Sequence, residues 1–194
     1  MALRVKRQKD ERHLHSIVHR LADIPGGVTV NIDTLVPGTI LKEGTVIAKG
    51  ENGMYNVVKT ATITKAATTT DTDYEVSKGN NFKVGDFFAA KVGAKSFAIT
   101  AINRDDPEKD VITLGTTLGA AVPLGTVVFE AKAESTGTAS ALKHAPLAVV
   151  GESHDVEANE NLFASAMLIG VLKADTAPAA SAEIKAAIPT IIFI

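Results

Sequence analysis

Three stretches of this chain repeat nearly the same phrase, in which a glycine leads into a short apolar run. They are residues 44–49 (GTVIAK), 85–91 (GDFFAAK) and 125–132 (GTVVFEAK). Glycine supplies the positive φ that a tight turn needs, and the β-branched and aromatic residues that follow suit a pleated, half-buried strand. A chain punctuated in this way is expected to form many short antiparallel strands, as small barrels and sandwiches do.

Turn signals between the apolar runs support this interpretation. Asn52-Gly53 predicts a type I′ hairpin turn within residues 45–60, and the apolar run at 166–172 is typical of a buried strand. The alanine-rich residues 178–187 predict one short helix. The breaker at 24–27 (IPGG) suggests a boundary. We therefore predict an N-terminal basic arm (1–24) and a single mainly β, barrel- or sandwich-like body (25–194), with a possible small-barrel subdomain at 60–135.

Composition narrows the functional classes. The 194 residues include no cysteine, which excludes disulfides, thiolate nucleophiles and cysteine-based zinc sites. Aromatic residues make up only 5% and tryptophan is absent, which disfavours the stacking of bases or sugars. We expect no cofactor and no metal.

The charge is unevenly distributed. The net charge is −2, but residues 1–20 carry six basic side chains against two acidic ones. A basic arm on an acidic body suggests docking to an acidic surface, although a solvated tail would give the same pattern. The residues predicted to dock are Arg4, Lys6, Arg7, Lys9, Arg12 and Arg20. Because the body has no basic stripe, we do not expect nucleic-acid binding.

The chain ends in an apolar run. Residues 190–194 (TIIFI) have high β propensity and no charge, so their exposure would favour aggregation. We expect a buried strand that starts after Pro189, with a partner in the same body or in a neighbouring subunit. The predicted oligomer-interface residues are Ile191, Ile192, Phe193 and Ile194.

Catalytic and metal-binding patterns are weak. There is no Gly-x-Ser-x-Gly elbow, phosphate-binding loop or dinucleotide fingerprint, so we do not expect an enzyme. His13, His15 and His19 would share one face of a strand, but no carboxylate joins them at ligand spacing. The aspartates at 71, 73, 105, 106 and 110 do not follow a calcium-loop pattern. The uncharged run 111–129 contains threonines, glycines and Pro123, and therefore predicts two strands rather than a membrane span.

Several of these residues resemble a known family. Residues 13–20 (HLHSIVHR) with 22–25 (ADIP), the GTVIAKG hairpin and 82–86 (FKVGD) resemble the head fibre proteins of tailed phages that infect Bacteroidetes. The pairing of 41–47 with 167–172 also resembles phage head decoration proteins. The resemblance implies a non-enzymatic virion protein on the capsid exterior, commonly a trimer, that binds the major capsid protein and can carry further fibre proteins.

This resemblance sets the functional expectation. It implies synthesis in the host cytoplasm followed by assembly onto the virion. A long fibre shaft would need a repeat that 194 residues do not contain, so a compact decoration or fibre-base protein is the better version. The alternative is a virion-displayed module that binds a host-surface glycan or receptor.

Overall fold

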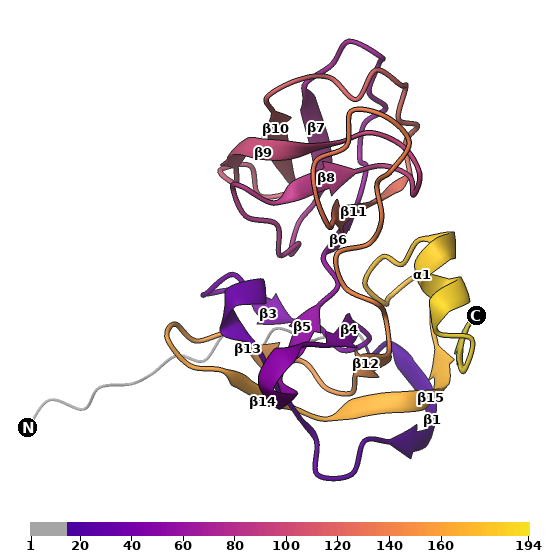
Figure 1. Cartoon of the computed structure of the whole chain (residues 1–194). Coiled ribbons are helices and arrows are strands. Elements are labelled where there is room, and N and C mark those ends of the chain that lie inside the picture. Colours follow the sequence, from indigo (N-terminus) through magenta and orange to yellow (C-terminus); the bar gives the residue numbers. More distant parts are fainter. Residues whose placement is uncertain (1–14) are drawn as a thin grey trace, which may run out of the picture.

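The computed structural model describes residues 15–194 and is mainly β, with one short α-helix near the C-terminus. Its strands form two stacked bodies, which lie one above the other in Figure 1. The expected fold class is confirmed.

The lower body is built on an eight-stranded sheet. Its strands run in the order β1 (Ile17–Asp23), β15 (Ala166–Leu172), β12 (Ala148–Val150), β4 (Val46–Lys49), β5 (Tyr55–Val57), β2 (Val28–Val30) and β14 (Leu162–Ala164), with β16 (Ile191–Phe193) paired in parallel to β15. A small sheet of β3 (Ile40–Leu41) and β13 (His154–Asp155) adjoins it, with the 3-10 turns η1 (Ile32–Thr34) and η2 (Glu51–Gly53). The helix α1 (Ala182–Ala187) packs through Ile184 against the core that contains Met167 and Leu172.

The upper body is a six-stranded sheet that curls on itself. Its order is β6 (Thr60–Thr62), β11 (Val127–Ala131), β8 (Phe87–Ala89), β9 (Ser96–Asn103), β10 (Lys109–Leu114) and β7 (Asp73–Ser77). A single bridge between Ile63 and Val76 brings the first strand back to the last. The enclosed core centres on Phe88, whose ring lies 5.1 Å from that of Tyr74 and 5.8 Å from that of Phe82.

The upper body interrupts the lower one in sequence. The chain leaves the eight-stranded sheet after β5, forms β6 to β11, and returns at β12. Figure 1 shows these two crossings, in magenta and orange, running side by side between the bodies. The six-stranded sheet thus falls within residues 60–135, the range of the predicted small-barrel subdomain.

Local predictions can be compared with the structure. The hairpin turn forms as expected, with positive φ at Asn52 (55°) and Gly53 (75°). The helix is shorter than the predicted 178–187, because Ser181 caps its start by accepting the N–H of Ile184. The body begins before the expected boundary at residue 25, since residues 17–23 already form β1 within the sheet.

The C-terminal run forms a strand, but it is only partly buried. Ile191 is 3% exposed, whereas Ile192 and Ile194 are 57% and 65% exposed. The expectation of a fully buried strand is therefore corrected. Because successive side chains of a strand point to opposite faces, pairing with β15 buries Ile191 and turns Ile192 outward.

Candidate functional site

Most of the basic residues singled out in the sequence lie outside the described part of the chain. These are Arg4, Lys6, Arg7, Lys9 and Arg12. Arg20 lies on β1, where its guanidinium is 3.1 Å from the Asp23 carboxylate and donates to the Gly151 carbonyl oxygen at 3.3 Å. Arg20 therefore contributes to the attachment of β1 to the sheet.

The start of β1 is fixed by a buried carboxylate. Glu43 Oε1 accepts the backbone N–H groups of Ser16 and Ile17, and Glu43 Oε2 lies 3.1 Å from His15 Nδ1. Glu43 belongs to the turn before Gly44, the first of the repeated glycines. This turn therefore ties the beginning of the described chain to the centre of the lower body.

An apolar surface covers the outer side of β1, β15 and β16. On these strands Ile17, Met167, Leu172 and Ile191 face the core. Val171 pairs with His19 on one side and with Ile192 on the other, so these side chains share the opposite face. The exposed large apolar residues on these strands, or directly after β16, are Val18, Leu21, Ile169, Ile192 and Ile194.

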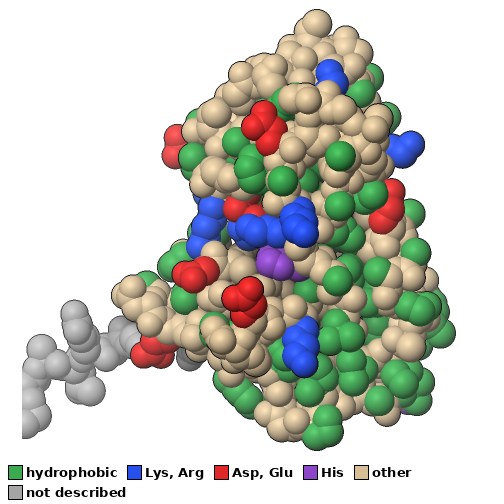
Figure 2. Space-filling model, viewed as in Figure 1, with side chains coloured by type: hydrophobic (Ala, Val, Ile, Leu, Met, Phe, Trp, Pro, Cys, Tyr) green, Lys and Arg blue, Asp and Glu red, His purple; other side chains and the backbone are tan. Residues whose placement is uncertain are grey.

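We call these five residues the β1–β15–β16 surface. In Figure 2, hydrophobic side chains gather over the lower right of the molecule, where Figure 1 places β1, β15 and the C-terminus. Extended apolar patches of this kind mark interaction surfaces in soluble proteins. Of the four predicted oligomer-interface residues, Ile192 and Ile194 belong to this surface, whereas Ile191 lies in the core. Phe193 is half-buried, and the Lys185 ammonium lies 4.7 Å from the centre of the Phe193 ring.

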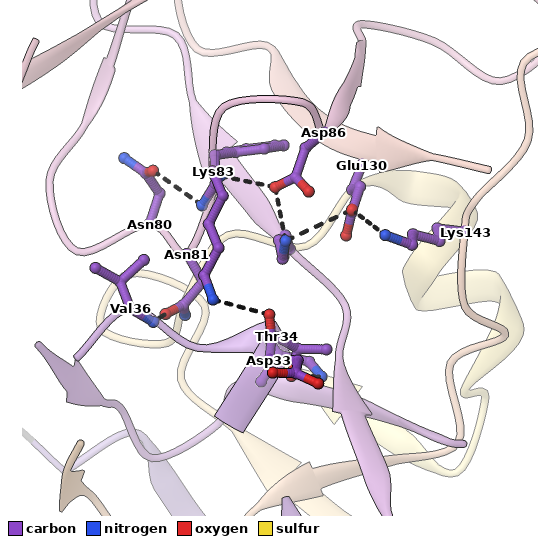
Figure 3. Close-up of polar contacts among 12 residues, drawn as sticks. Asp33, Thr34, Val36, Asn80, Asn81, Lys83, Asp86, Glu130 and Lys143 are labelled. Atoms are coloured by element: carbon purple, nitrogen blue, oxygen red, sulfur yellow. Dashed lines mark hydrogen bonds and ion pairs between the residues drawn. The ribbon is translucent and has the colours of Figure 1, made fainter. Parts of the chain in front are cut away.

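A second feature is a buried charged cluster where the two bodies meet (Figure 3). Lys59 Nζ lies 2.6 Å from Asp86 Oδ2 and 3.5 Å from Glu130 Oε1, and Lys143 Nζ donates to the same Glu130 oxygen at 2.6 Å. The side chains of Lys59 and Glu130 are 3% and 2% exposed. We call Lys59, Asp86 and Glu130 the buried triad.

Strand alternation explains why the three side chains meet. Each lies two residues from a side chain of the upper core: Lys59 from Ala61, Asp86 from Phe88, and Glu130 from Val128. Residues i and i+2 of a strand share a face, and β11 lies between β6 and β8. The triad therefore closes the lower end of the upper core.

Backbone contacts hold the triad in place. The Lys83 N–H donates to Asp86 Oδ2 at 2.7 Å, within a turn closed by the Asp86 N–H on the Lys83 carbonyl. Glu130 donates its backbone N–H to the Lys59 carbonyl and accepts the Lys143 N–H. Each member of the triad thus has a fixed backbone as well as a buried side chain.

The two carboxyl groups have opposite protonation preferences. Burial and the neighbouring Asp86 carboxyl raise the pKa of Glu130. Burial also opposes the ionisation of Asp86, but contacts with Glu130, Lys59 and the Lys83 N–H outweigh it and lower the pKa of Asp86. Glu130 therefore keeps a proton to higher pH than Asp86 does. Glu130 Oε2 is buried and has no hydrogen-bond partner among the described residues.

Two of the aspartates noted in the sequence, Asp110 and Asp71, make contacts that stabilise the fold. Asp110 is buried between Lys78 Nζ (2.7 Å) and Arg104 Nη1 (2.9 Å), and Asp71 caps a turn by accepting the Thr68 N–H. Within residues 15–194 no group of histidines and carboxylates is arranged to hold a metal ion. Over the same range no helix is long and apolar enough to cross a membrane.

The sequence interpretation missed the buried triad, although two of its members lie in the repeated glycine phrases. A signal was present: in 127–131 (VVFEA) the alternation places Glu130 on the same face as Val128, so a carboxylate occupies a core position. Its partners Lys59 and Asp86 are distant in sequence, and only the topology brings them together.

No family model, curated protein or solved structure matches this chain in the comparisons made.

Proposed function

We propose that this chain is a non-enzymatic structural protein of a phage virion, bound to the outside of the capsid as a decoration or fibre-base protein. The observation that carries the proposal is the β1–β15–β16 surface, which presents large apolar side chains from three adjacent strands. The resemblance of residues 13–20 and 82–86 to head fibre proteins of tailed phages supplies the setting.

The apolar surface is assigned to contacts between copies of the chain. Its five members are all apolar, and their burial would gain about 25 cal/mol for each Å² of apolar area. It lies at the edge of the sheet, since among residues 15–194 β1 pairs only with β15. Homotrimerisation through this surface would remove both the patch and the exposed edge from solvent.

The basic N-terminal residues are assigned to the major capsid protein. All of them except Arg20 precede β1 in sequence, and Glu43 fixes the start of β1 to the body. Single exposed charge pairs contribute little, but a trimer would present three such segments, and attachment would become multivalent. The body itself would thus need only modest affinity for the capsid.

The same features favour a structural role over a glycan-binding role. A sugar-binding surface needs exposed aromatic rings, and among residues 15–194 Phe163 is the only large aromatic side chain classed as exposed, at 64%. One isolated ring on β14 does not form a platform.

Cryo-electron microscopy of virions that encode this chain tests the proposal. We expect density for the two stacked bodies on the capsid exterior, in groups of three. Absence of the chain from purified virions, measured by mass spectrometry of their proteins, would overturn the proposal. Purified chain lacking residues 2–14 provides the matched variant, because it keeps β1 and the contacts of Glu43; it should fold normally and bind capsids poorly.

A further inference from the structure

The buried triad has the geometry of a reaction site as well as of an ion pair. Lys59 Nζ lies 2.6 Å from Asp86 Oδ2, and because Oδ2 is bonded to Cγ, the amine is held next to an electrophilic carbon. Both side chains are almost fully removed from water, with Lys59 3% and Asp86 11% exposed. A reaction between an amine and a carboxyl group that are held in contact is intramolecular, and the effective concentration of each group is therefore very high.

A third group supplies the acid that amide formation requires. Glu130 Oε1 lies 3.5 Å from Lys59 Nζ and is held by Lys143 at 2.6 Å. The other oxygen, Oε2, is buried without a hydrogen-bond partner among the described residues, and is therefore available to take up and release a proton.

We propose that Lys59 and Asp86 join spontaneously in an intramolecular isopeptide bond, with Glu130 as the proton-transferring residue. The assignment is independent of the proposed virion role, because it concerns a self-modification within one chain.

The atoms of the reaction balance without any further reagent. A proton passes from the Lys59 ammonium to the Asp86 carboxylate, which leaves a neutral amine and a neutral acid. Nζ then attacks Asp86 Cγ, and the C–N bond forms. Glu130 takes one proton from the nitrogen and delivers one to the departing oxygen, so its own protonation state is unchanged at the end. The C–O bond breaks, and water leaves.

The surroundings favour the product. Exclusion of bulk water protects the new amide from hydrolysis. The side chains of Lys59 and Glu130 are 3% and 2% exposed, so little bulk water can reach the new bond.

Two other ion pairs show why this pair is singled out. Lys109 and Glu75 are also 2.6 Å apart, but Lys109 is 36% exposed, and the further contact of Glu75 is a second ammonium, that of Lys65. Asp110 is fully buried, but it lies between two cations, Lys78 and Arg104. Only the triad combines a buried lysine with two carboxyl groups among the ion pairs of residues 15–194.

Mass spectrometry of the intact, full-length chain tests the proposal. The unmodified sequence and the joined product differ by the mass of one water molecule. We expect the purified protein to be lighter than its sequence by that amount. After trypsin digestion, residues 50–65 should appear joined to residues 84–91, because trypsin does not cleave after an acylated Lys59.

Variants separate the role of each group. Lys59→Arg and Asp86→Ala should both have the full mass of their sequences. Glu130→Gln keeps the size of the side chain and should also remain unjoined. As a matched control, Glu75→Gln removes the 2.6 Å ion pair with Lys109 and should retain the loss of water.

The protein with its own sequence, without any substitution, decides the proposal even if a variant fails to fold. Recovery of residues 50–59 and 84–91 as separate peptides from folded protein, with an intact mass equal to that of the sequence, would overturn it. A Glu130→Gln protein that loses water at the normal rate would overturn the role given to Glu130.

Discussion

Two neighbouring residues of β16 offer a direct test of how the C-terminal strand contributes to the molecule. Ile191 is 3% exposed and packs in the core that contains Ile184 and Met167, whereas Ile192 is 57% exposed. Truncation of a buried isoleucine to alanine removes buried apolar area and leaves a cavity, at a typical cost of about 2–5 kcal/mol. Truncation of a surface residue usually changes stability by less than about 0.5 kcal/mol.

These values predict a clear difference in thermal stability. Taking about 3 kcal/mol for Ile191→Ala, and roughly 2–4 °C per kcal/mol for a protein of this size, the melting temperature should fall by about 6–12 °C. Ile192→Ala should leave it unchanged when association is absent. Differential scanning calorimetry at several protein concentrations measures both effects, because association makes the melting temperature depend on concentration.

The same pair should behave in the opposite way in an assembly assay. Ile192→Lys places a charge on the β1–β15–β16 surface, so light scattering should show loss of the trimer while the monomer still melts normally. Equal destabilisation by Ile191→Ala and Ile192→Ala at low concentration would refute the burial argument. A trimer that survives Ile192→Lys would refute the assignment of this surface to contacts between copies.

The remaining predictions concern other parts of the fold. Glu43→Ala leaves the Ser16 and Ile17 N–H groups without their acceptor, and should cost about 1–3 kcal/mol in chemical denaturation and expose the start of β1 to proteolysis; unchanged protection would contradict this. Burial and the nearby Lys143 and Lys59 charges lower the pKa of His144 below 6.5. The unfolded chain therefore binds this proton more readily than the folded chain, and stability should fall as pH drops below 6.5. The His144→Gln protein should lose this part of the pH dependence of stability, and an unchanged pH profile would count against the prediction. The Lys59–Asp86 bond would close a loop between residues that are 27 apart in sequence, and this closure would stabilise the folded state by about 3–4 kcal/mol in the chain-entropy model. The Glu130→Gln protein should therefore melt at a lower temperature than the joined protein and migrate differently on a denaturing gel.

The regular strands could be predicted because their signals are local. The Asn52-Gly53 turn forms as expected because both positions accept positive φ, and residues 127–131 of the third glycine phrase form β11. β1 was harder to predict, since its backbone pairing with β15 has three register shifts, which disrupt the alternation of apolar and polar residues along it.

The exposed apolar surface and the buried triad could not be predicted, because both depend on contacts between residues that are distant in sequence. The exposure of Ile192 follows from the parallel pairing of β16 with β15, and the sequence shows only that the run is apolar. The buried triad requires β11 to lie between β6 and β8, although the order of these strands along the chain differs. Long-range topology therefore decides which charged residues become neighbours.

The backbone of Glu130 also determines how separable the upper body is. Its N–H bonds to Lys59, where the chain enters that body, and its carbonyl bonds to Lys143, where the chain leaves. Because the N–H and C=O groups of one strand residue point to the same side, entry and exit lie next to each other on one side of β11, which leaves only a short gap between them. Such a gap can be spanned by a short turn or by another domain whose termini are close together. The lower body is therefore a scaffold onto which evolution, or a protein engineer, can graft a different outward-facing module without altering the order of its own strands.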